Sequence, residues 1–201
     1  FSEQGLFKTN RFKIAMTGFL KKSKAFHKAI SSLIYNSNLE IIVAGLVKEK
    51  EVIQAIERLQ KSRETKAIIR LIPRYLTDQE LHSLIHEANC VIQPYSQEYY
   101  SSSGILHLAA GMGKVLLLSP SPKFKELTSR IPFCEVRDND YMKRVEKLRT
   151  SSELVSEIER EIRSFARETE WSIVASKTHS LYERIASNSI TIPHGRLTVV
   201  G

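Results

Sequence analysis

Short apolar runs alternate with longer segments of helical periodicity over most of the chain. The runs predict six strands, at residues 12–18, 39–45, 67–72, 90–93, 114–118 and 133–136. The segments between them repeat apolar residues every three or four positions, as amphipathic helices do. Buried strands separated by single helices predict a parallel sheet covered on both faces. We therefore expect an α/β fold with a Rossmann-like, doubly wound, six-stranded parallel sheet.

The pattern changes after residue 148. Thr150 to Glu153 has the spacing of a capping box, and apolar stripes continue to residue 186, which predicts one or two further helices. The chain starts at Phe1 without a methionine, which favours a start within a longer protein. We expect a linker from a preceding N-terminal domain at 1–11 and a Rossmann-like domain at 12–148. Helices at 149–186 are expected to pack back on that domain, followed by a tail at 187–201.

Charge and composition limit the classes of binding partner that the chain is expected to have. The net charge of +8 suits nucleic acid, an anionic membrane surface or a phosphorylated small molecule. The basic residues are spread out and form no aromatic-basic platform, so we do not expect nucleic acid. Cys90 and Cys134 lie in apolar runs, which favours free thiols and a cytoplasmic protein. The sequence has no Cys/His spacing typical of a metal site.

The stretch from Val91 to Ser119 carries a candidate anion site. It reads as a buried strand, a polar loop, a helix and a second strand. Ser102, Ser103 and Gly104 open the helix, where a serine caps free backbone N–H groups and glycine allows close approach. The positive end of the helix dipole would face the carboxyl edge of the sheet, and phosphate is its usual anion. An ordinary strand-to-helix turn with a serine cap is the alternative.

Two other loops are expected at the same edge. Residues 18–24 follow the first strand and carry Lys21 and Lys24, while Arg74 and Tyr75 follow the third strand. A strand that ends in Gly18, lysines in the next loop and a capped helix start would together form a phosphate cradle. The lysines could instead be solvated, and Arg74 could simply pair with an acid. Neither G-x-G-x-x-G nor the P-loop pattern is present, which argues against NAD and against ATP hydrolysis.

Four stretches carry a resemblance to a known family. They are G-x-L-K-x-x-K at 18–24, the segment 75–81, P-Y-(x)7-S-G-I-L at 94–106 with its continuation to Val115, and the segment 171–182. In this order they resemble the C-terminal, donor-binding domain of retaining GT-B glycosyltransferases (glycosyl transferases group 1), over residues 12–185. In that family the last segment crosses back to the N-terminal domain.

The resemblance implies retaining transfer of a sugar from a nucleoside diphosphate sugar to a glycan or lipid-linked acceptor, in surface polysaccharide biosynthesis. Lys21 and Lys24 would hold the diphosphate without a metal, and Glu98 would be the catalytic residue. The implied donor-binding set is completed by Gly18, Phe19, Arg74, Tyr75, Tyr95, Ser102, Ser103, Gly104 and Ile105. A partner N-terminal domain would be required for activity, so the fragment alone should transfer nothing. The location would be cytoplasmic, including the inner face of the membrane.

The sequence departs from the family at two positions. The family has a second glutamate near the position of Leu108, and a glycine at the position of Ala25. The missing glutamate favours an alternative, a degenerate module of the same fold that binds a nucleotide or a partner without catalysis. A flavodoxin-like or epimerase-related nucleotide domain is a third option and would show a different strand order. His107 is expected to be a packed core residue.

Overall fold

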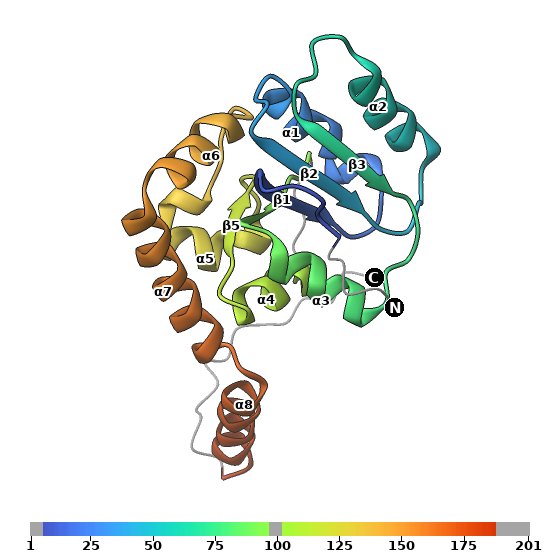
Figure 1. Cartoon of the computed structure of the whole chain (residues 1–201). Coiled ribbons are helices and arrows are strands. Elements are labelled where there is room, and N and C mark those ends of the chain that lie inside the picture. Colours follow the sequence, from blue (N-terminus) through green and yellow to red (C-terminus); the bar gives the residue numbers. More distant parts are fainter. Residues whose placement is uncertain (1–5, 97–101, 188–201) are drawn as a thin grey trace. The chain divides into compact units, whose positions relative to one another are not determined.

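The computed structural model describes residues 6–96 and 102–187 (Figure 1). The expected tail therefore lies outside the described residues, apart from its first position. Contacts between residues divide the chain into two compact units, with the boundary between Ala166 and Arg167.

The first unit is built on a five-stranded parallel sheet. Its order is β3-β2-β1-β4-β5, where the strands are β1 (Phe12–Thr17), β2 (Leu39–Ala44), β3 (Ile68–Ile72), β4 (Cys90–Gln93) and β5 (Val115–Leu118). Ile14 pairs with Ile41 on one side and with Cys90 on the other. The order reverses between β1 and β4, as in the Rossmann fold, whereas a flavodoxin-like sheet runs 2-1-3-4-5. The doubly wound prediction is confirmed, and the flavodoxin-like alternative is excluded.

Helices cover both faces of this sheet. Figure 1 shows α1 and α2 on one face, with α3 and α4 on the other. The helices of the chain are α1 (Phe26–Leu33), α2 (Lys50–Lys61), α3 (Asp78–Glu87), α4 (Gly104–Gly111), α5 (Lys125–Arg130), α6 (Tyr141–Thr150), α7 (Ser152–Glu168) and α8 (Trp171–Ala186). Short 3-10 turns occur at η1 (Lys22–Lys24), η2 (Pro122–Phe124) and η3 (Pro132–Cys134). Strands β2, β4 and β5 are buried along their whole length, as expected for a sheet covered on both faces.

The prediction of a sixth strand is wrong. Residues 132–134 form η3, and only a single bridge joins Glu135 to Leu118, supported by a 2.8 Å bond from the backbone N–H of Val136 to the carbonyl of Leu118. Pro132 has no N–H to donate and its fixed φ favours a tight turn, so the apolar run bends before it can pair. The sheet in the described residues therefore ends at β5.

One buried charge anchors the amino end of the sheet. The Glu40 side chain on β2 is fully buried and accepts a 2.6 Å hydrogen bond from Arg70 Nε on β3. It also accepts bonds from the backbone N–H groups of Lys8 and Thr9 and from the Thr9 hydroxyl. These contacts fix residues 8–9, within the expected linker, against the sheet.

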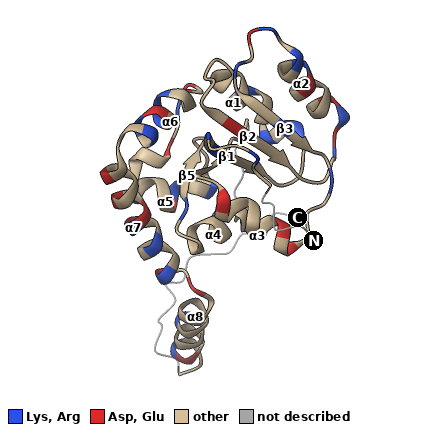
Figure 2. Cartoon of the chain, viewed as in Figure 1, with Lys and Arg blue, Asp and Glu red and all other residues tan. Residues whose placement is uncertain are grey.

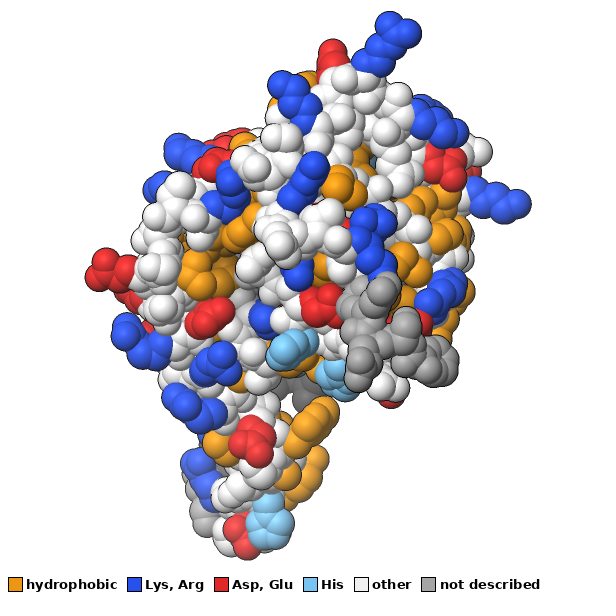
Figure 3. All heavy atoms as spheres, in the orientation of Figure 1, with side chains coloured by type: hydrophobic (Ala, Val, Ile, Leu, Met, Phe, Trp, Pro, Cys, Tyr) orange, Lys and Arg blue, Asp and Glu red, His pale blue; other side chains and the backbone are white. Residues whose placement is uncertain are grey.

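The C-terminal helices divide between the two units. Ile158, Ile162 and Phe165 on α7 are buried in the core of the first unit. The second unit contains α8, which has no buried residue and leaves Trp171, Leu181 and Tyr182 exposed. No helix among the described residues has the length and apolar character needed to cross a membrane. Charged residues lie mostly on helices and loops (Figure 2), and the face seen in Figure 3 shows basic side chains scattered among acidic ones.

Candidate functional site

A cavity of about 550 Å³ opens at the carboxyl edge of the sheet, beside the point where the strand order reverses. Every residue of the predicted donor-binding set except Arg74 lines it: Gly18, Phe19, Lys21, Lys24, Tyr75, Tyr95, Ser102, Ser103, Gly104 and Ile105. Its size lies within the range of small-molecule sites. The lysine loop and the serine-glycine helix start therefore meet at one place, as the phosphate-cradle hypothesis requires.

Lys24 is the most buried charge of this cavity, with 5% of its surface exposed. Its Nζ donates to Gln93 Oε1 at 2.9 Å and to the Thr17 carbonyl at 3.3 Å. Burial, together with the ammonium groups of Lys123 and Lys21, lowers the pKa of Lys24 to about 7. Lys24 is therefore a partly protonated group near neutral pH, and a bound anion would favour its charged form.

Two glycines allow the backbone to pass close to this lysine. Gly18 has φ +122°, and a Cβ there would lie 2.6 Å from Lys24 Nζ. Gly45, at the end of β2, has φ +149°, and its Cβ would lie 1.9 Å from the Gly18 carbonyl oxygen. A glycine directly follows each of these strands, because a side chain at Gly18 or Gly45 would not fit between the two strand ends and the Lys24 ammonium.

The turn between the lysine loop and α1 has an unusual backbone conformation at Ala25. Ser23 does not cap α1; its buried hydroxyl lies in η1 and has no hydrogen-bond partner within the described residues. The cap position is Ala25, which has the left-handed φ of 39°. This conformation is easiest for glycine, which explains physically why a glycine suits this position in the family that the sequence resembles.

Helix α4 brings its N-terminus to the cavity. Its N-cap is Ser103, whose hydroxyl accepts a 3.4 Å bond from the Leu106 N–H, so the predicted serine cap is confirmed. A Cβ added to Gly104 would meet nothing within 4 Å, which places open space beside the first turn. The N–H groups of Gly104 and Ile105 belong to this positively polarised first turn.

A third lysine, Lys123, also lines the cavity, although it was not among the predicted residues. Its Nζ lies 4.2 Å from the centre of the Tyr95 ring, and Lys24 Nζ lies 5.0 Å from the same centre. Burial and the neighbouring Lys21 lower the pKa of Lys123. No residue of the cavity lining, within the part of the chain that is described, carries a carboxylate.

Three other expectations have separate outcomes. Arg74 does not line the cavity; it forms an ion pair with Glu80 at 2.6 Å and donates to the Tyr75 carbonyl. Glu98, the expected catalytic residue, lies outside the described residues. His107 is exposed and stacks on Phe165 with a ring separation of 6.1 Å, so its expected place in the core is wrong.

Sequence reasoning missed the apolar wall of the cavity as well as Lys123. This wall is formed by Leu46, Leu76, Leu81 and Leu108. Leu46 directly follows Gly45, and Lys123 follows β5, so the rule that ligands bind beyond strand carboxyl ends could have found both. Leu81 and Leu108 belong to helix stripes that looked like ordinary core positions.

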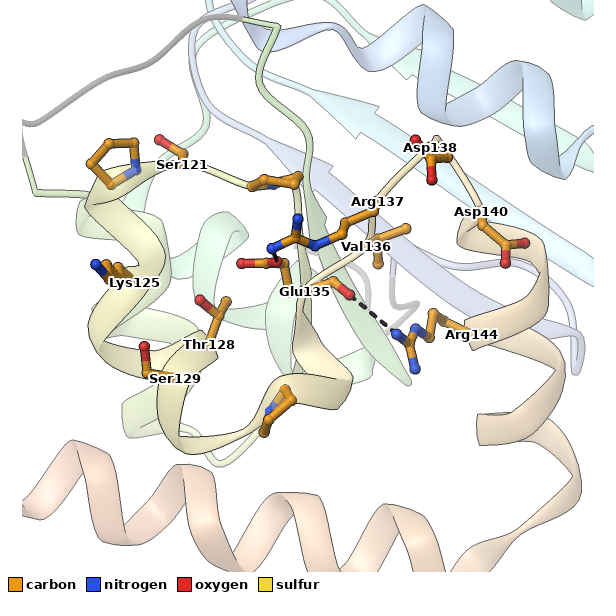
Figure 4. A pocket seen from close by; sticks show the side chains of 13 residues that line it. Ser121, Lys125, Thr128, Ser129, Glu135, Val136, Arg137, Asp138, Asp140 and Arg144 are labelled. Carbon is orange, nitrogen blue, oxygen red and sulfur yellow. Dashed lines mark hydrogen bonds and ion pairs between the residues drawn. The ribbon is translucent and has the colours of Figure 1, made fainter.

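A second, larger cavity of about 960 Å³ lies beyond β5, between α5 and the start of α6 (Figure 4). Arg137 pairs with Glu135 at 2.5 Å, and Arg144 donates to the Glu135 carbonyl. Asp138 and Asp140 also line this cavity. Its basic groups are thus balanced by nearby acids and a carbonyl, so it lacks the uniform positive charge of the first cavity.

The described residues contain no cluster of His, Cys, Asp and Glu suited to a metal ion.

No protein-family model matches the sequence, and no curated protein matches it. The fold, however, resembles solved structures. The catalytic domain of cholesterol-α-glucosyltransferase from Helicobacter pylori aligns with a TM-score of 0.63 and 16% identity, over 80% of this chain and 100% of that one. HepE from Anabaena, in complex with UDP and glucose, aligns with a TM-score of 0.70 and 14% identity, over 89% of this chain and 49% of that one.

A UDP-forming α,α-trehalose-phosphate synthase from Burkholderia xenovorans aligns with a TM-score of 0.70 and 12% identity, over 88% of this chain and 45% of that one. The chain thus spans about half the length of HepE and of this synthase. At these identities the comparison establishes the fold. The neighbours are GT-B glycosyltransferases, and this chain has a GT-B-type fold that corresponds to one Rossmann-like half, consistent with the C-terminal domain.

Proposed function

We propose that the chain is the donor-binding domain of a glycosyltransferase that uses a nucleoside diphosphate sugar. The observation that carries the proposal is the meeting of Lys21, Lys24 and the first turn of α4 around one cavity at the carboxyl edge of the sheet. Ammonium groups and helix N-termini both favour phosphate. The structurally similar HepE was crystallised in complex with UDP and glucose, which supports the same ligand class here.

The proposed reaction is retaining transfer to a glycan or lipid-linked acceptor in surface polysaccharide biosynthesis. The bond between the anomeric carbon and the diphosphate oxygen breaks, and the diphosphate leaves with the electron pair. The acceptor hydroxyl forms the new bond on the same face of the sugar and passes its proton to an oxygen of the departing diphosphate. Lys21, Lys24 and the α4 backbone would stabilise the departing charge electrostatically, in the role that a metal ion has elsewhere. Glu98 would hold the sugar or face the developing oxocarbenium.

The proposal also names the partners of this domain. The acceptor site would be supplied by an N-terminal GT-B domain, so the chain alone would bind the donor without transferring the sugar. The protein would work in the cytoplasm, at the inner face of the membrane when its acceptor is lipid-linked.

A panel titration tests the proposal. Calorimetry with UDP, GDP and ADP should show binding of at least one nucleotide, and Lys24→Met should weaken it about tenfold or more, since a hydrogen bond to a charged group contributes roughly 1.5–3 kcal/mol. Lys28→Met is the matched control, because Lys28 is an exposed lysine on α1 outside the cavity lining. Absence of binding to all three nucleotides by the wild-type chain would contradict the proposal.

A second candidate is a nucleotide-binding module without catalysis. The family that the sequence resembles has a glutamate near the position of Leu108. Here Leu108 lines the cavity, so this part of the wall is apolar and carries no carboxylate. The two candidates differ in the full-length protein. An enzyme would release nucleoside diphosphate when donor and acceptor are present, whereas a binding module would hold the nucleotide and release none.

A further inference from the structure

The cavity holds more positive charge than a lysine pair supplies. Lys21, Lys24 and Lys123 all line it, and they come from segments far apart in the sequence: the loop and turn after β1, and the turn after β5. Together with the N-terminus of α4 they surround the same space. A departing nucleoside diphosphate carries one negative charge more than the intact sugar nucleotide, because the phosphate oxygen that was bonded to the sugar becomes a terminal, charged oxygen.

Lys123 is held in place by its neighbours. It occupies η2, which begins at Pro122, and the next residue, Phe124, is fully buried. The Phe124 ring packs edge-on against Tyr95, with ring centres 5.6 Å apart. Tyr95 is itself fixed by a 2.7 Å bond from its backbone N–H to the Ser119 hydroxyl. The turn that carries Lys123 is thus tied to the end of β4 before any ligand binds.

Two lysine ammonium groups lie close to the ring of Tyr95. Lys24 and Lys123 approach the same aromatic centre at 5.0 and 4.2 Å, where each gains cation–π attraction. This attraction offsets part of their mutual repulsion. Such an arrangement keeps the two amino groups together in the free protein, so that an anion meets a preorganised site.

We propose that Lys123 is a third diphosphate-binding residue of this cavity, positioned by Tyr95 and Phe124. The inference rests on the proposed function and adds to it a residue, from the turn after β5, that the sequence motifs did not indicate. Lys123 would contribute to recognition of the diphosphate and little to recognition of a nucleoside monophosphate, because the second phosphate supplies the charge that a third lysine matches.

The test compares two ligands and two neighbouring lysines. Titrations use the full chain and the tightest binder among UDP, GDP and ADP, together with the matching monophosphate. Lys123→Met should weaken the diphosphate about tenfold and the monophosphate by less than about threefold. Lys125→Met is the control, because Lys125 is exposed and lines the other cavity. Lys123→Arg, which keeps the charge and can stack on Tyr95, should stay within about threefold of wild type.

A second readout separates ligand contact from a structural role. The ammonium of Lys123 is among the causes that lower the pKa of Lys24, along with burial and Lys21. Lys123→Met should therefore move the pH at which diphosphate affinity declines to a higher value, and Lys125→Met should not. Lys24 also faces Gln93, Phe26, Tyr95 and the Thr17 carbonyl, none of which changes in either variant.

The outcomes are distinct. If Lys123→Met and Lys125→Met bind the diphosphate equally well, or if mono- and diphosphate weaken together, the role of Lys123 is refuted while the proposed function stands. If the wild-type chain binds none of the nucleotides, both are refuted. Lys123→Gln replaces Lys123→Met should the latter fail to fold, as judged by circular dichroism.

Discussion

The ammonium of Lys24 donates a 2.9 Å hydrogen bond to Gln93 Oε1, which joins the turn after β1 to the end of β4. These two strands are neighbours at the reversal point of the sheet. The bond therefore spans the place where a Rossmann-like sheet binds its ligand. It also holds a positive charge in a position that is costly for the free protein and favourable for an anion complex.

Nucleotide affinity should depend on pH through Lys24. The pKa of Lys24 is lowered to about 7 by burial and by Lys123 and Lys21, so the free cavity loses this charge as pH rises through 7. An anion binds the protonated form better, so affinity should fall between pH 7 and 9, and binding near pH 7 should take up protons. Calorimetry in buffers of different ionisation enthalpy measures that uptake.

Lys24→Met provides the control for this pH effect. The variant lacks the titrating group, so the decline in affinity above pH 7 should become much shallower. An equal decline in the variant would assign the pH dependence to another group.

Gly18→Ala should weaken binding and stability together. The added methyl would lie 2.6 Å from Lys24 Nζ, and φ of +122° is strained for alanine. We expect a stability loss of about 1–2 kcal/mol and about tenfold weaker nucleotide binding, because the ammonium must move. Chemical denaturation and calorimetry measure the two effects.

Gly111→Ala is the matched control for Gly18→Ala. Gly111 lies at the other end of α4, where a Cβ meets nothing within 4 Å. Alanine is the better helix former, so stability should stay level or rise by up to about 1 kcal/mol, with binding unchanged. Equal binding losses in both variants would mean that the contact with Lys24 is irrelevant.

Glu40→Ala should destabilise the first unit strongly. It removes the buried partner of Arg70 and the acceptor for residues 8 and 9. Arg70 is 38% exposed and can be solvated without its partner, so the main loss is the acceptor for the N–H groups of Lys8 and Thr9, which costs about 1–3 kcal/mol. Glu51→Ala removes an exposed carboxylate 3.9 Å from Lys22 and should cost less than about 1 kcal/mol. Urea unfolding compares the two, and similar losses would contradict the anchoring role of Glu40.

Much of this fold could be predicted from the sequence because its signals are local. Glycines directly follow β1 and β2, Thr77 and Glu80 have the spacing of a capping box at the start of α3, and apolar runs mark every strand of the described sheet. The prediction of a sixth strand was wrong because the apolar run at residues 133–136 does not itself show whether the chain pairs with β5 or turns at Pro132. The strand-end rule points to the turn that carries Lys123, but the place of its side chain in the cavity depends on packing between Phe124 and Tyr95, which no local pattern encodes.

In the candidate site, too, some residues could be predicted from the sequence and others only from the structure. Lys21, Lys24 and Ser103 could be found because phosphate chemistry and strand order point to one edge of the sheet. The left-handed turn at Ala25 and the pairing of Arg74 with Glu80 required coordinates, since either residue fits several conformations.

The binding predictions all require that the cavity at the end of β1 and the start of α4 receives a nucleoside diphosphate. This can be tested directly by titrating the isotope-labelled chain with UDP, GDP and ADP and following the backbone amide signals in NMR spectra. We expect saturable shifts at Gly18, Gly104 and Ile105, with Thr128 and Asp140 in the other cavity unchanged. Shifts confined to the other cavity, or none with any of the three nucleotides, would contradict this binding site.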